Sequence, residues 1–184
     1  MRCFSRSFVL LAGWFGVVHG AIAFGLQFGV TAPIIMKAKD PEGVYGYRGI
    51  VTAQPEAWIW PKASVYLAGS FGHWWVHGAT TNRSLSIYAI APVLRYYLKK
   101  SPTFSPYVEA SIGASWMTKT YLGDRHNLGM HYAFQDEVGI GMAYGKAQQW
   151  YATLSALHYS NGSMASHNSG ITIPAILSLG YRFS

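Results

Sequence analysis

The chain has 184 residues, of which 16% are aromatic and only 11% charged, and its formal net charge is +7. About 25% charged residues is usual for a soluble domain, so much of the exterior is expected to face something other than water. No basic cluster exceeds Lys99-Lys100, which argues against nucleic acid as a partner and favours phosphorylated lipid.

Residues 1–23 are interpreted as a cleaved signal peptide. Arg2 and Arg6 give a positive start, residues 8–18 are apolar, and Ala21-Ile22-Ala23 has the small-x-small form of a signal-peptidase site. The mature domain would then span 24–184, with a net charge of +5 once both arginines are removed. Cys3, the only cysteine, leaves with the signal, so the mature chain has neither a disulfide nor a thiol nucleophile.

Most of the remaining chain alternates with a period of two, which is typical of strands with two unlike faces. From Tyr107 to Trp116, small and polar residues occupy one parity and apolar residues the other. In the last segment, the same pattern places Ile173 and Ala175 on the apolar face with Leu177. Pro55 leaves the end of the second segment open. Eight strands are predicted, separated by turn formers: 24–35, 44–54, 63–77, 84–98, 105–119, 130–144, 147–160 and 171–183.

Two architectures accommodate eight antiparallel strands of this size, a soluble lipocalin-like barrel and an outer-membrane barrel. The apolar faces carry the large residues and the polar faces the small ones, which fits a lipid-facing wall around a narrow lumen. Tyr and Trp near strand ends are typical of interfacial girdles, and the final "GYRFS" nearly has the aromatic ending of bacterial outer-membrane barrels. The predicted fold is therefore all-β, an eight-stranded antiparallel transmembrane β-barrel of the outer-membrane type.

The stretch "LHYSNGS" at 157–163 holds candidate catalytic residues. With both termini in the periplasm, the seventh strand carries His158 and Ser160 to its outer end, and strand parity turns both toward lipid. Unpaired polar groups are costly there, but they would be useful in attacking an ester lipid, with His158 as general base and Ser160 as nucleophile. Asn161 and Asn168 are candidates to stabilise an oxyanion and to hold the loop. The alternative is that these are only interfacial polar residues at a strand end.

The chain resembles the lipid A 3-O-deacylases of the PagL type. The resemblance rests on "HYSNGS" followed by "HNSG", on "SLSIYAIAPVLRYYL", on "PYVEASIGASW" and on "NLGMHYAFQDEVGIGMAYG", in the family's order and clearly over 84–184. It implies a bacterial outer-membrane esterase that removes the 3-hydroxyacyl chain at the 3 position of lipid A in lipopolysaccharide. Such an enzyme uses a serine triad without metal or cofactor; a homodimer is left open.

The resemblance also assigns residue roles. Ser160 matches the family's nucleophile, His158 its base, Asn161 the asparagine after the serine, and Asn168 the asparagine associated with the oxyanion hole.

The acid of the triad is a departure from the family. Its glutamate falls on Thr172 when counted from Asn168, or nearer Ala175 when counted back from "YRF", and neither residue is acidic. Three interpretations follow: the imidazole is oriented by Thr172, an asparagine or water; Asp136 or Glu137 on the adjoining strand substitutes; or activity is lost. Asp136 is not assigned to the triad, because the resemblance implies an acid at that position in addition to the family's separate triad acid. The competing functions are therefore a non-catalytic small barrel, which could be a degenerate member lacking the triad acid, and a soluble lipocalin-like carrier.

Two other sets of residues carry side chains that can bind ligands. His73 and His77 would lie about 13 Å apart on one strand face, too far to share a metal ion, and are interpreted as interfacial residues. Lys119 and Arg125, on a predicted external loop, are either contacts for lipid A phosphates or ordinary loop charges.

Overall fold

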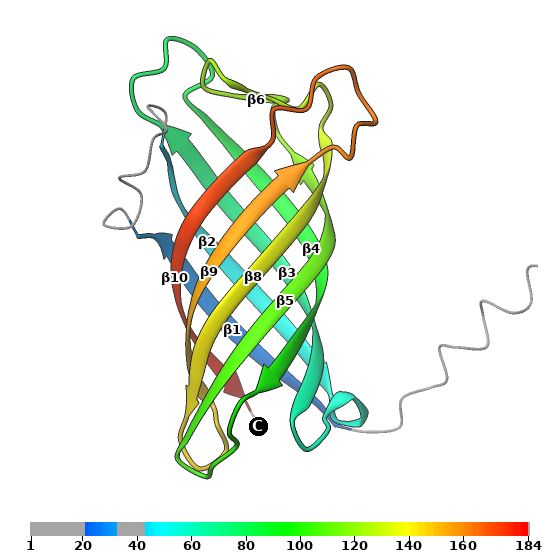
Figure 1. The fold of residues 1–184 in the computed structure, drawn as a ribbon, viewed down its shortest axis with the longest axis vertical. Coiled ribbons are helices and arrows are strands. Elements are labelled where there is room, and N and C mark those ends of the chain that lie inside the picture. Colours follow the sequence, from blue (N-terminus) through cyan, green and yellow to red (C-terminus); the bar gives the residue numbers. More distant parts are fainter. Residues whose placement is uncertain (1–20, 33–42, 184) are drawn as a thin grey trace, which may run out of the picture.

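The computed structural model describes residues 21–32 and 43–183, so most of the predicted signal peptide lies outside the described residues. Eight strands close into an antiparallel barrel in the order β1-β10-β9-β8-β5-β4-β3-β2 (Figure 1). The predicted fold is confirmed. The barrel strands are β1 (Ile22–Thr31), β2 (Val44–Pro55), β3 (Ala63–Val76), β4 (Ser84–Tyr97), β5 (Phe104–Met117), β8 (Tyr132–Tyr144), β9 (Trp150–Ser160) and β10 (Ile171–Phe183).

The strand ends differ little from those predicted, and residues 33–35, predicted as the end of the first strand, lie outside the described residues. β2 stops at Pro55, and a short 3-10 turn, η2 (Glu56–Trp58), follows it. β1 begins at Ile22, so the predicted cleavage after Ala23 would shorten it by two residues. A small hairpin of β6 (Tyr121–Leu122) and β7 (His126–Asn127) was not predicted, because two-residue strands carry no periodic signal.

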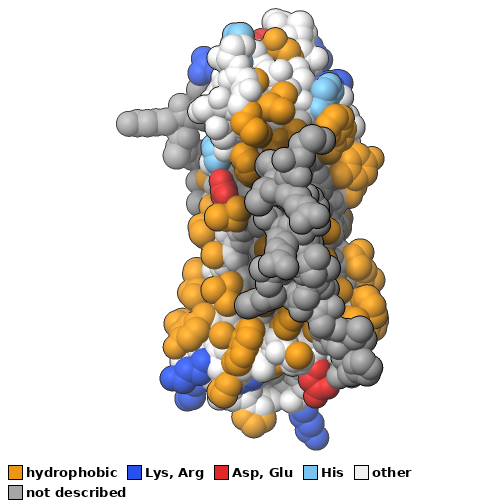
Figure 2. Space-filling model, turned by 90° about the vertical axis from the view of Figure 1, so that its right-hand side faces the viewer, with side chains coloured by type: hydrophobic (Ala, Val, Ile, Leu, Met, Phe, Trp, Pro, Cys, Tyr) orange, Lys and Arg blue, Asp and Glu red, His pale blue; other side chains and the backbone are white. Residues whose placement is uncertain are grey.

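The outer wall of the barrel is strongly hydrophobic. Ile112, Val138 and Leu179 are 69%, 62% and 65% exposed. Figure 2 shows hydrophobic side chains along the wall, with Lys and Arg side chains toward the two ends. A water-facing barrel would reverse this pattern, so the soluble carrier is excluded. Among the described residues, no helix is long and apolar enough to span a membrane.

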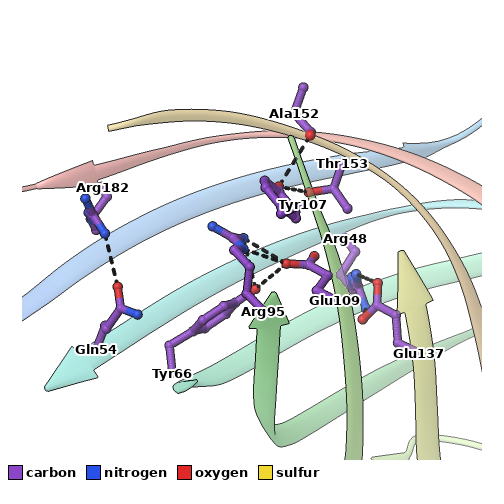
Figure 3. Close-up of polar contacts among 10 residues, drawn as sticks. All are labelled: Arg48, Gln54, Tyr66, Arg95, Tyr107, Glu109, Glu137, Ala152, Thr153 and Arg182. Atoms are coloured by element: carbon purple, nitrogen blue, oxygen red, sulfur yellow. Dashed lines mark hydrogen bonds and ion pairs between the residues drawn. The ribbon is translucent and has the colours of Figure 1, made fainter. Parts of the chain in front are cut away.

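One half of the interior is polar and is filled by two buried ion pairs (Figure 3). Arg48 on β2 contacts Glu137 on β8, with an Nη2–Oε1 distance of 2.5 Å. Arg95 on β4 contacts Glu109 on β5 at 2.8 Å, and its guanidinium lies 4.0 Å from the ring centre of Tyr107. A cavity of about 20 Å³ lies between the two pairs and has room for about one water molecule.

The other half of the interior, toward the β6–β7 hairpin, is packed with apolar side chains, which the sequence did not lead us to expect. Trp74, Ile87 and Leu157 are among its fully buried members. The lumen is therefore filled with side chains along its length, as the narrow bore of an eight-stranded barrel permits.

A β-bulge in β10 corrects one prediction. Ile173 pairs with Leu157 and Ile176 with Ser155, so β10 has one more residue than β9 over this step. Ile173 and Ala175 consequently face the interior, whereas Leu177 faces out, and the single apolar face predicted for them is wrong. Pro174 lies within the bulge, where its missing N–H removes no regular ladder bond. Before the bulge, the outward parity includes Thr172.

Candidate active site

His158 and Ser160 lie at the end of β9 where the longest described connections, 118–131 and 161–170, gather (Figure 1). The inward residues of β9, such as Leu157 and Tyr159, are buried, whereas His158 and Ser160 are partly exposed on the outward face. The lipid-facing parity predicted for both is what the structure shows. Each side chain stands beside its neighbouring strands, because His158 pairs with Asp136 of β8 and with Thr172 of β10.

Thr172 is the hydrogen-bond partner of the imidazole. Its Oγ1 lies 2.8 Å from Nδ1 of His158. With Nδ1 so engaged, Nε2 is the ring nitrogen left for Ser160. Ser160 follows two residues later on the same face, about 6.6 Å along the strand at 3.3 Å per residue. Within the described residues no hydrogen bond joins the two side chains, and such bonds often tighten only when substrate binds.

Gly170 leaves room for the imidazole. Its φ of +67° is in the left-handed region, and a Cβ there would lie 2.8 Å from Cε1 of His158. A side chain at this position would be strained and would push the histidine away from its partner.

The two asparagines have different surroundings. Asn161 is fully buried: its Nδ2 donates to the carbonyls of Leu128 and His167 at 2.6 and 2.7 Å, and its Oδ1 accepts from the N–H of Ser163. This side chain is fully engaged in shaping the loop. Asn168 is exposed, and its Oδ1 accepts from the Asn161 N–H at 3.0 Å. The Nδ2 of Asn168 makes no hydrogen bond within the described chain, so of the two asparagine side chains it is that of Asn168 that is free to bind a ligand.

The β6–β7 hairpin supports the 161–170 loop, a role that sequence reasoning missed. His126 Nδ1 donates to the Gly170 carbonyl at 2.9 Å, and the Ser169 N–H donates to the Asn127 carbonyl at 2.9 Å. Together with the Asn161 bond to Leu128, these contacts hold the 161–170 loop against the β6–β7 hairpin, more than thirty residues earlier in the chain. The turn-rich "GDRHNLG" indicated a loop there, but no local signal indicated its contact.

The two acids on the adjoining strand β8, Asp136 and Glu137, point to opposite faces of the barrel wall. Glu137 faces the lumen, where Arg48 takes both of its oxygens, so the alternative that Glu137 orients His158 is wrong. Asp136 faces outward opposite His158 but makes no hydrogen bond within the described residues. No three His, Cys, Asp or Glu side chains of the described chain are grouped to hold a metal ion.

A hydrophobic-walled barrel with a histidine–serine pair on its lipid-facing side belongs to the small outer-membrane barrels with a candidate hydrolase site. A family model described as lipid A 3-O-deacylase (PagL) matches residues 47–182. The chain belongs to this family.

One curated relative and two solved structures are similar to this chain. The lipid A deacylase PagL of Pseudomonas aeruginosa is 27% identical over 138 residues, which cover 70% of this chain and 76% of the relative. The crystal structure of the outer membrane enzyme PagL superposes with a TM-score of 0.64 at 22% identity, covering 85% of this chain and 98% of that one. Neisserial surface protein A gives 0.51 at 10% identity, covering 88% and 96%, and thus shares only the fold.

Proposed function

We propose that this barrel is a lipid A 3-O-deacylase of the bacterial outer membrane that works as a serine esterase, with Ser160 as nucleophile and His158 as general base. Family membership supports the reaction. The observation that carries the residue roles is the His158–Thr172 hydrogen bond on the outward face, two residues from Ser160. An ester bond of a lipid in the outer leaflet can reach this face without entering the lumen.

In the first step, Nε2 of His158 takes the Ser160 proton as Oγ attacks the ester carbonyl. The carbonyl oxygen becomes an oxyanion, to which we assign the Nδ2 of Asn168 as the hydrogen-bond donor. Collapse of the tetrahedral intermediate breaks the bond to the sugar oxygen. His158 returns its proton to that oxygen, which leaves an acyl group on Ser160 and a free hydroxyl on lipid A.

In the second step, water replaces the sugar. His158 takes a proton from the water, the resulting hydroxide attacks the acyl-serine, and the proton returns to Ser160 as the 3-hydroxy fatty acid leaves. Residues 162–169 of the adjoining loop are mostly exposed, so water can reach the acyl group from the loop side.

Thr172 takes the place of the usual carboxylate. For Nε2 to act as the base toward Ser160, Nδ1 must carry the ring proton, and the hydroxyl oxygen of Thr172, 2.8 Å away, then accepts its hydrogen bond and holds that tautomer. A hydroxyl carries no charge to stabilise the imidazolium, so we expect a slower enzyme than one with an acid here. A serine protease deprived of its orienting acid loses about 10⁴ in turnover, yet residual catalysis remains.

Mass spectrometry of lipid A tests the function. Cells whose lipid A carries an ester-linked 3-hydroxyacyl chain at position 3 would express the wild type, Ser160→Ala or His158→Ala. We expect loss of one 3-hydroxyacyl chain with the wild type alone. Ser166→Ala, in the same loop, is the matched control and should behave as wild type. An unchanged lipid A profile with folded wild-type barrel in the membrane would overturn the proposal.

A further inference from the structure

A second histidine–serine pair faces outward on the opposite wall of the barrel. His73 on β3 and Ser86 on β4 are directly paired, and Nδ1 of the histidine lies 3.0 Å from Oγ of the serine. β3 is four strands from β9 in either direction around the closed sheet. The proposed reaction uses neither residue. An ionisable side chain on a lipid-facing wall calls for a functional role.

Aromatic rings surround this pair. The ring centres of His73, Tyr47 and Trp75 form a triangle with sides of 5.9, 6.1 and 6.3 Å. Tyr47 is 39% exposed, and the three rings belong to the outward face of β2 and β3. We call Tyr47, His73, Trp75 and Ser86 the opposite-wall patch. It offers ring faces for apolar contact and ring nitrogens and hydroxyls for hydrogen bonds.

A cation lies beside the patch. Nζ of Lys119 donates to the Ser84 carbonyl at 2.9 Å, and Ser84 is the strand partner of Trp75. An ammonium group has three donors, so two remain for a ligand. Just beyond, His77 lies edge-on to Tyr45 with ring centres 4.9 Å apart. This combination of cation, imidazoles and aromatic faces suits a phosphate attached to a sugar.

The chemistry of Ser86 favours binding over hydrolysis. Its backbone N–H donates to Oγ1 of Thr118 at 2.9 Å. In serine hydrolases the N–H of the nucleophile commonly helps to hold the oxyanion, and here that donor is occupied. An interfacial girdle accounts for Tyr and Trp, but it does not require a hydrogen-bonded His–Ser pair among them.

We propose that the opposite-wall patch binds a second molecule of lipid A, which stays intact, on the side of the barrel away from Ser160. The patch lies toward the same end of the barrel as His158, which is the outer-leaflet end in the proposed orientation. The inference depends on that orientation and not on hydrolysis at Ser160.

Binding stoichiometry tests this proposal. The Ser160→Ala barrel, purified in detergent, would be titrated with lipid A and measured by native mass spectrometry. We expect two lipid A molecules per barrel, and tenfold weaker binding of the second in the His73→Ala and Trp75→Ala variants. Tyr88→Ala, an exposed aromatic residue farther along β4, is the matched control and should retain both.

Two further arms distinguish a specific lipid A site from a general lipid annulus. Phosphatidylglycerol should not displace the second lipid A; equal binding of both lipids would mean an annulus and would overturn the proposal. A single bound lipid A, or a second one insensitive to both patch variants, would also overturn it. His73→Ala in an otherwise wild-type chain should leave deacylation unchanged. Absence of deacylation with two lipids bound would count against the catalytic proposal alone.

Discussion

Replacing the partner of the imidazole should change the rate in both directions. Thr172→Val removes the hydroxyl that lies 2.8 Å from Nδ1 of His158. A neutral hydrogen bond contributes roughly 0.5–1.5 kcal/mol, so we expect deacylation to slow by about threefold to tenfold. Thr172→Glu should place a carboxylate there. A hydrogen bond to a charged group contributes about 1.5–3 kcal/mol, and the difference of about 1–2 kcal/mol predicts a roughly 5- to 30-fold gain.

The assay is the initial rate of fatty-acid release from lipid A by purified barrels, measured between pH 5 and pH 9. The added carboxylate favours a protonated imidazole, so the acid limb of the Thr172→Glu profile should move to higher pH. Thr172→Ser keeps the hydroxyl and should remain near wild type. In a His158→Ala background the glutamate should give no gain. Rates for Thr172→Val and Thr172→Glu that both equal wild type, in folded barrels, would refute an orienting role for this residue.

Three other changes test the interior and the loops. Glu137→Gln leaves the buried guanidinium of Arg48 without its ion pair, and we expect the free energy of unfolding to fall by about 3–5 kcal/mol. Heat-dependent gel mobility would measure this loss, and a loss below about 1 kcal/mol would contradict the expectation. Asn161→Ala removes three side-chain hydrogen bonds, so we expect faster amide hydrogen exchange in the 161–170 loop and loss of deacylation. Unchanged exchange would argue against a structural role for Asn161. The pKa of Asp124 is lowered by hydrogen bonds from the backbone of Thr80 and the side chain of Thr81. The stability that the Asp124 carboxylate gives to these loops is therefore present above its unfolded pKa near 3.9 and is lost as the pH falls through the lower folded pKa. Proteolysis of the 77–83 and 118–131 loops should therefore increase on acidification below about pH 4, and this increase should be absent in Asp124→Asn.

Strand periodicity predicted the barrel because a two-residue repeat survives wherever one face meets lipid and the other the lumen. The same parity placed His158 and Ser160 outward on β9, where no irregularity intervenes. It failed in β10, because the extra residue of the bulge exchanges inside for outside and parity cannot be carried across it. Strand parity counted back from the C-terminus would therefore have predicted, wrongly, that Thr172 faces the lumen.

The contacts that support the 161–170 loop could not have been predicted from the local sequence pattern. Asn161 bonds to Leu128, and Gly170 to His126, so the loop is shaped by contacts between segments far apart in the chain. The apolar packing at one end of the lumen escaped prediction for a related reason. Parity says which residues point inward, but it does not say which of them meet at the same height in the barrel.

Covalent labelling of Ser160 would test the central claim most directly. A fluorophosphonate probe reacts with a serine whose hydroxyl is activated by a neighbouring base, and peptide mass spectrometry locates the adduct. We predict modification of Ser160 in the wild-type barrel, none in His158→Ala, and less in Thr172→Val. An actively deacylating barrel that is labelled on another serine, or not at all, would contradict the assignment of Ser160 as the nucleophile.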